Sequence, residues 1–86
     1  MVYRLRTEET EGLWIMTTIR KAFSRNFKRL LVEKDYTMKG FSYVHGFDYS
    51  AVWNWAHGRA CPKLDTAFRI AKALEVSVND LVKGAE

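Results

Sequence analysis

Residues 36–62 read YTMKGFSYVHGFDYSAVWNWAHGRACP, and this stretch decides the fold. Thr37 is a good N-cap residue, because its hydroxyl oxygen can accept a hydrogen bond from the first turn of a following helix. The apolar spacing predicts that this helix covers residues 38–45. Gly46 then ends it, since glycine adopts the left-handed backbone conformation at low cost.

A second short helix is predicted immediately after this turn. Asp48 is a strong N-cap residue for a helix over residues 49–57, and Gly58 ends that helix. The segment that follows is a loop, because Pro62 cannot occupy a helix interior. Ser42 supplies a small side chain where the two helices approach each other. Two short helices joined by a tight turn with one glycine are the arrangement of a helix-turn-helix.

Helical periodicity continues on both sides of this unit. A first helix is predicted from Thr18 to about Glu33, and a fourth begins at Leu64. The capping-box pattern at residues 77–80 predicts a short fifth helix. The sequence therefore predicts an all-α domain of five helices over residues 18–83. The apolar residues expected in its core are Ile19, Phe23, Phe27, Leu30, Leu31, Phe41, Val44, Val52, Trp55, Leu64, Ala67, Phe68, Ala71, Leu74 and Leu81.

Residues 1–17 form an N-terminal extension with a different pattern. Short runs rich in β-branched and aromatic residues, at 2–6 and 13–17, flank a polar segment that ends in glycine, which favours a β-hairpin. A disordered leader is the alternative. A lone hairpin is only marginally stable in water, so a hairpin here needs a packing partner. Trp14 and Ile15 are the candidate contact residues.

The positive charge of the chain is concentrated in its middle. The 86 residues include 14 Lys and Arg against 10 Asp and Glu, a formal net charge of +4. Residues 18–63 hold nine of the basic residues and three acidic ones, a net charge of +6, and the segments on either side each carry −1. A single basic block is typical of a surface that binds a polyanion, although charge alone fits an ordinary solvated surface equally well.

Composition argues against several other classes of protein. Cys61 is the only cysteine, and His45 and His57 have no matching ligands at metal-binding spacing, so no disulfide, metal or cofactor is expected. No apolar run approaches the roughly 18–20 residues needed to span a membrane, and no signal peptide is evident, so we expect a cytoplasmic protein without membrane contact. An enzyme is not expected, since the chain shows no nucleophile–base arrangement, phosphate-binding glycine loop or carboxylate pair.

The segment from Tyr36 to Val52 resembles the helix-turn-helix of lambda-repressor-like, xenobiotic-response-element-type regulators. The likeness continues without a gap through Gly58 and Pro62. It then extends into residues 64–81, which resemble the fourth and fifth helices of that family almost position for position. With the first helix included, it covers roughly three quarters of the chain. The resemblance implies a transcriptional regulator that binds duplex DNA, most often a repressor and a homodimer, as among phage and prophage regulators.

Some positions depart from the family pattern. Many members pair an arginine in the first helix with a glutamate near the end of the recognition helix, and the corresponding residues here are Leu31 and Ala56. Because both are apolar, the change leaves no lone buried charge. The second helix of the family usually begins with a glutamine that holds a phosphate, where this chain has Met38. The backbone N–H groups of that helix start, capped by Thr37, can still hold the phosphate.

The resemblance also implies which residues meet DNA. The third helix of such a domain enters the major groove, with Tyr49, Ser50 and Asn54 facing base edges at its first, second and sixth positions. Asn54 suits a bidentate contact to adenine. Tyr49 can form a hydrogen bond or pack on a thymine methyl group. For Ser50 and Asn54 the alternative is plain solvated polarity. The residues expected at the sugar–phosphate backbone are Thr37, Met38, Lys39, His57, Arg59 and Lys63, with Arg20 and Arg25 as further candidates.

Trp53 is the residue that this pattern explains least. Val52 and Trp55 are expected in the core, so Trp53 should face outward, toward DNA or a partner, with partial burial against the first helix as the alternative. Residues 1–17 are a second candidate for a dimer or partner contact. The alternative function is therefore a protein-interaction module on the same fold, or an antitoxin-type protein whose residues 1–17 bind its partner.

Overall fold

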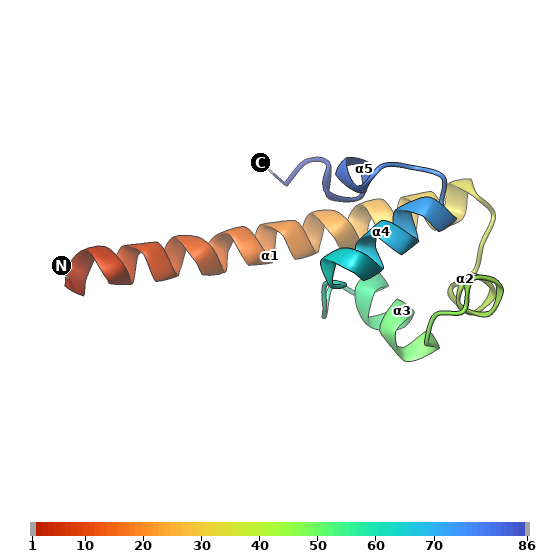
Figure 1. Cartoon of the computed structure of the whole chain (residues 1–86), viewed down its shortest axis with the longest axis horizontal. Helices are drawn as coiled ribbons and strands as arrows, with labels where there is room; N and C mark the ends of the chain where they lie inside the picture. The colour runs from red at the N-terminus through yellow and green to blue at the C-terminus, as the bar shows by residue number, and fades with distance from the viewer. Residues whose placement is uncertain (1, 86) are drawn as a thin grey trace.

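The computed structural model describes the backbone of residues 2–85 and the side chains of residues 18–85. Within the described backbone the regular structure is entirely helical, as Figure 1 shows. The all-α class and the number of helices predicted from the sequence are confirmed. In chain order the helices are α1 (Val2–Glu33), α2 (Met38–His45), α3 (Tyr49–Ala56), α4 (Leu64–Ala73) and α5 (Val78–Val82).

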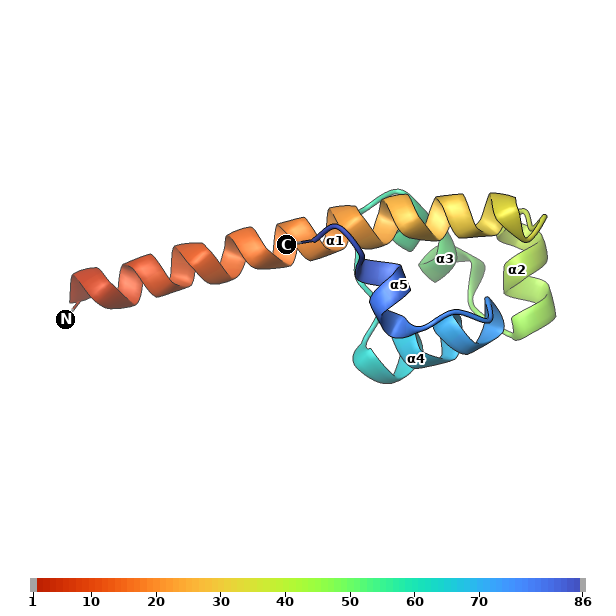
Figure 2. The same cartoon turned by 90° about the horizontal axis from the view of Figure 1, so that it is seen from above.

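Helix α1 is longer than predicted, and the other helices pack along its C-terminal half. Its 32 residues account for the long dimension of the molecule, 50 Å, because a helix rises about 1.5 Å per residue. Its C-terminal half lies against the other helices, while its N-terminal half projects beyond them in both views (Figures 1 and 2). The hairpin predicted over residues 2–17 is therefore wrong, and this segment is helical.

The error has a physical reason. A five-residue run rich in β-branched and aromatic residues fits a strand and a helix equally well, so periodicity alone could not separate them. Arginine, glutamate and leucine fill much of residues 4–13, and these are good helix formers. The segment also lacks proline and leads directly into the strongly helical stretch after Thr18. Trp14 and Ile15, the expected contact residues, lie outside the described side chains.

The core is centred on Phe27, which is fully buried. Its ring centroid lies 5.4 Å from that of Phe23 on the same helix, 5.6 Å from Phe41 on α2 and 6.2 Å from Trp55 on α3. Three helices thus converge on one ring. The buried cluster around it consists of Phe23, Phe27, Leu30, Leu31, Phe41, Val52, Trp55, Ala56, Ile70, Ala71, Leu74 and Leu81.

Some residues predicted in the core lie at the surface instead. Val44 is 61% exposed, Leu64 79%, Phe68 62% and Ile19 37%. Helix α4 buries Ile70, Ala71 and Leu74, the stripe next to the one that carries Leu64 and Phe68. The apolar face of α4 is wider than the surface that the neighbouring helices cover. Part of this face, with Leu64 and Phe68, therefore remains exposed.

The ends of the helices follow the predicted signals with one exception. Gly46 has a φ of 72° and Gly58 a φ of 70°, as their stop positions require. Ser77 and Asp80 form the predicted capping box at the start of α5. Asp48 occupies the N-cap position of α3, but its side chain makes no capping hydrogen bond, contrary to the prediction.

Two buried polar side chains of α1 hold distant parts of the chain, and the sequence did not single them out. The Nδ2 group of Asn26 donates hydrogen bonds to the carbonyl oxygens of Leu81 (3.0 Å) and Lys83 (2.9 Å). The hydroxyl of Ser24 donates to the carbonyl oxygen of Ala56 (2.7 Å). These bonds tie the end of α5 and the end of α3 to the same helix.

We predict that Asn26→Ala lowers the free energy of unfolding by about 1–3 kcal/mol, because it leaves two carbonyl oxygens without their buried donor. Urea denaturation followed by circular dichroism measures the change. Asn79→Ala is the matched control, since Asn79 is exposed. Equal stability of the two variants would contradict the anchoring role of Asn26.

A second prediction concerns acid stability. The hydrogen bonds from Ser77 to the carboxylate lower the pKa of Asp80 below its ordinary value of 3.8. A pKa that is lower in the folded state adds stability above the unfolded-state value, and this stability is lost as the pH falls through the folded-state pKa. Asp80→Asn should therefore flatten the decline of the unfolding free energy below about pH 4. Asp48→Asn is the control, because Asp48 makes no capping bond, and an unchanged decline in Asp80→Asn would refute the prediction.

Candidate nucleic-acid interface

The turn between α2 and α3 is rigidly built. The backbone N–H of Phe47 donates to the carbonyl oxygen of Ser42 (2.9 Å), which closes the turn across Gly46. The Phe47 ring stacks on Phe41 at 5.4 Å and meets Trp55 at 5.7 Å. Ser42 is buried where the sequence required a small side chain, and its hydroxyl donates to a carbonyl of its own helix. The two helices therefore have a fixed mutual orientation, and the helix-turn-helix geometry is present.

Helix α3 has one buried face and one free face. Val52, Trp55 and Ala56 are buried, and the prediction that Val52 and Trp55 belong to the core is confirmed. The remaining arc spans roughly 140° of the helix circumference, at 100° per residue. It carries Tyr49, Ser50, Trp53, Asn54 and, at the C-cap, His57, and we call these five residues the free arc of α3.

The three residues predicted to read bases all lie on the free arc. Tyr49 and Ser50 are exposed and Asn54 is half-buried. Among the described side chains none of the three has a hydrogen-bond partner, so their polar groups remain available. The ammonium group of Lys39 lies 5.8 Å from the centre of the Tyr49 ring, which brings a cation from α2 to the first turn of α3. Their role in contacting bases stays a prediction.

The residues predicted to meet phosphates lie at the start of α2 and in the segment that begins at the C-cap of α3. Thr37 accepts a hydrogen bond from the backbone N–H of Gly40 (2.9 Å) and so caps α2, as expected. The side chain of Met38 packs against the core, so only its backbone N–H, unpaired in the first helical turn, can hold an anion. Lys39 is exposed beside it, and Arg59 and Lys63 are exposed in the segment after α3.

Trp53, His57 and Arg59 form a compact stack at the end of α3. The Trp53 and His57 rings are nearly parallel, with centroids 3.8 Å apart and an angle of 15°. The Arg59 guanidinium carbon lies 5.4 Å from the centre of the Trp53 ring. The i,i+4 spacing of Trp53 and His57 places the two side chains next to each other on a helix surface, so the sequence already indicates this contact. The structure thus brings together residues that had been assigned separate roles.

Other candidate cations on α1 do not share one surface. Arg25 lies beside Gly84, where a β-carbon would meet its guanidinium nitrogen at 2.8 Å, so it belongs to the side of α1 that faces the C-terminal end of the chain. The positive charge of Arg20 is close enough to the Cys61 thiol, in the loop after α3, to favour its thiolate form. The Cys61 pKa is raised above its ordinary value by partial desolvation, against the opposing charge of Arg20. The thiol is therefore protonated near neutral pH.

Leu31 and Ala56 are both buried, and α1 packs against α3. An apolar pair at these positions therefore leaves no charge to be neutralised in the interface between the two helices. The hydrogen bond from Ser24 to the Ala56 carbonyl oxygen fixes the end of α3 on the same surface of α1. This hydrogen bond holds the buried face of α3 on α1, and it therefore also sets the position of the free arc.

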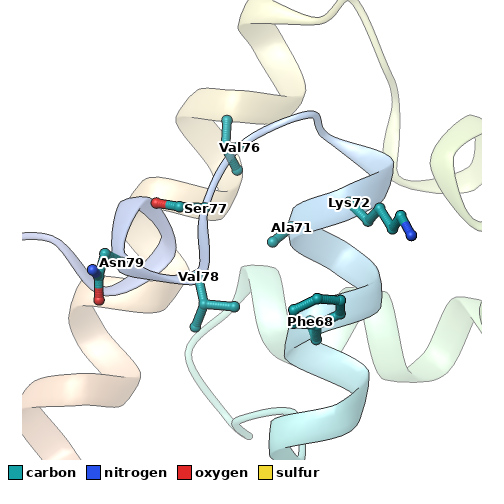
Figure 3. Close-up of a pocket in the computed structure, with 7 residues that line it drawn as sticks. All are labelled: Phe68, Ala71, Lys72, Val76, Ser77, Val78 and Asn79. Carbon is teal, nitrogen blue, oxygen red and sulfur yellow. The ribbon is translucent and has the colours of Figure 1, made fainter.

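A groove of about 400 Å³ lies between α4 and the start of α5, away from the free arc. Figure 3 shows Phe68 and Val78 on its two sides, with Lys72 extending away from it. Ser77, also at its wall, is engaged in capping α5. The groove is thus mainly apolar, and its polar groups offer no catalytic arrangement.

Two further searches cover the described part of the chain. No group of three or more His, Cys, Asp and Glu side chains among the described residues is placed to hold a metal ion. In the same part of the chain, no helix is both long and apolar enough to cross a membrane.

The comparisons with known proteins concern the fold. No protein-family model matches the chain, and no curated protein sequence matches it. The structure is similar to the crystal structure of the hypothetical transcription factor NHTF from Neisseria, with a TM-score of 0.70, 22% sequence identity and 74% of each chain covered. The two chains share a fold, and the resemblance to lambda-repressor-like regulators rests on the sequence.

We predict that Thr37→Ala lowers the free energy of unfolding by about 1 kcal/mol, because the N-cap bond to Gly40 is lost. The loss should fall on α2, whose start carries the free backbone N–H groups. Hydrogen exchange of the α2 amides and thermal unfolding measure it. Thr37→Ser keeps the hydroxyl and should retain most of the stability, so an equal loss in both variants would contradict the capping role.

Proposed function

We propose that this protein is a transcriptional regulator that binds duplex DNA by placing α3 in the major groove. The observation that carries the proposal is the free arc of α3. Its side chains Tyr49, Ser50 and Asn54 have no hydrogen-bond partners among the described side chains. Two cations lie against it, Lys39 over Tyr49 and Arg59 over Trp53. Unpaired donors and acceptors on an exposed helix suit base edges, and flanking cations suit phosphates.

The charge distribution and the fold support the same proposal. Residues 18–63 carry a net charge of +6 and include both helices of the helix-turn-helix. The protein of similar fold from Neisseria is described as a hypothetical transcription factor. We assign residues 18–83 to the DNA-binding domain and residues 1–17 to an N-terminal extension, in which residues 2–17 continue its first helix.

The finer parts of the proposal follow from the family resemblance. The protein acts as a repressor, as the resemblance to lambda-repressor-like regulators implies. It binds as a homodimer to two half-sites about one helical turn apart. The N-terminal half of α1 projects beyond the other helices (Figure 2), and α4 exposes Leu64 and Phe68, so we propose that one of these two elements makes the dimer contact.

Selection from random duplexes with the purified chain tests the proposal. The selected sequence and a scrambled control are then titrated across a salt series. A palindromic sequence bound at least about a thousand-fold more tightly than the control would support a dimeric, sequence-specific regulator. Weak binding without sequence preference would reject it.

A second candidate function is a protein-interaction module, and the apolar surface of α4 favours it. Leu64 and Phe68 are 79% and 62% exposed, and Phe68 also lines the apolar groove between α4 and α5. Exposed apolar patches often mark protein contacts. An antitoxin-type protein would combine both functions. Loss of DNA selectivity with retained binding of a protein partner at α4 would favour this candidate.

A pair of variants distinguishes base contact from phosphate contact. Asn54→Ala should relax the preference at one base pair, at a cost of about 1–3 kcal/mol in binding. Arg59→Ala should instead weaken binding to all duplexes and lower the salt slope by about 1. Fluorescence anisotropy with selected and scrambled duplexes measures both. If the two variants behaved alike, the assignment of roles would fail.

A further inference from the structure

Trp53 is not part of the hydrophobic core, although it is half-buried. Among the described residues the core cluster and the apolar side chains packed against it include Val52 and Trp55 but not Trp53. Its ring instead contacts two surface residues, His57 and Arg59. The indole is therefore a surface group whose position is held by other surface groups.

The stack holds the indole in one orientation. The Trp53 carbonyl oxygen lies 2.8 Å from Nδ1 of His57, and since a carbonyl can only accept, Nδ1 donates the hydrogen. This bond fixes the imidazole, which in turn lies parallel to the indole at 3.8 Å. The Arg59 guanidinium adds a cation–π contact at 5.4 Å. An aromatic group held in this way loses little conformational freedom when it binds.

Trp53 also occupies the middle of the free arc. It lies one helical turn after Tyr49 and Ser50 and directly before Asn54, so a groove that receives those three residues also receives the indole. A large apolar edge in the major groove needs an apolar partner. Base edges there present one apolar group, the C5 methyl of a pyrimidine, found on thymine and on 5-methylcytosine.

We propose that Trp53 is a specificity-determining residue whose indole contacts the C5 methyl group of a pyrimidine in the major groove. This inference rests on the proposed function. His57 and Arg59 hold the indole against the helix, and Arg59 carries its charge toward the adjacent phosphate. Trp53 thus adds an apolar contact to a surface that otherwise reads bases through hydrogen bonds.

The experiment is a methyl scan of the selected duplex. Each thymine in turn is replaced by uracil, which removes only the methyl group, and in a second arm each cytosine is replaced by 5-methylcytosine. Binding of the full chain is measured for the wild type, Trp53→Ala and Trp53→Phe. Tyr43→Ala is the matched control, because Tyr43 is an aromatic residue 90% exposed on α2 and outside the free arc. Circular dichroism melting establishes that each variant is folded.

At one base pair of each half-site, loss of the methyl group should weaken wild-type binding about fourfold. If the pyrimidine there is cytosine, methylation should strengthen binding by a similar factor. Trp53→Ala should show neither effect at that position, Trp53→Phe should keep part of it, and Tyr43→Ala should keep all of it.

Two results would overturn the inference. In one, every methyl substitution has the same effect on the wild type and on Trp53→Ala. In the other, Trp53→Ala lowers the salt slope while its methyl sensitivity is unchanged, which would mean that Trp53 only positions Arg59. In both cases sequence-specific binding, and with it the proposed function, would stand. A wild-type chain without sequence preference would instead reject the proposed function and this inference together.

Discussion

Phe27 is the residue on which the arrangement of the helix-turn-helix depends. Its buried ring is met edge-on by Phe41 from α2 and by Trp55 from α3, and it stacks on Phe23 within α1. Helices of eight residues are not stable alone in water, so α2 and α3 gain most of their stability from such contacts. Because both helices pack on the same ring, the angle between them is set by α1 rather than by the turn alone.

This packing also determines which residues of α3 remain at the surface. Once Val52, Trp55 and Ala56 face α1, the opposite side of a helix this short is left without a covering element. The hydrogen bond from Ser24 to the Ala56 carbonyl oxygen holds the C-terminal end of α3 on α1, where Trp55 also packs on Phe27. A binding surface placed on such an element is better ordered before binding than one on a loop, so less conformational entropy is lost on binding.

The sequence predicted those features that depend on local interactions. The caps at Thr37 and Ser77 and the stop at Gly46 were predicted correctly, because each involves residues a few positions apart. The bonds of Asn26 join residues 55 and 57 positions apart, and no local pattern indicates them. The exposure of Leu64 and Phe68 depends on how much of α4 its neighbours cover, and the helical state of residues 2–17 on continuity with α1. The residues of the free arc were all named from the sequence, but the stack of Trp53, His57 and Arg59 was not foreseen.

Under the proposed function, that stack affects how the two components of DNA binding combine. In a surface where cations bind phosphates and polar side chains bind bases, affinity and specificity can vary independently. Here the Arg59 guanidinium lies against the indole in the middle of the free arc, so the cation and the proposed apolar contact residue touch each other. Residues in contact are expected to show non-additive effects. Removal of Trp53 also frees the guanidinium that it orients, and removal of Arg59 frees the indole. Under the proposed function, this contact would therefore couple part of the affinity of the surface for DNA to its selectivity, whereas Lys39, at the other end of the arc, lies on a separate helix.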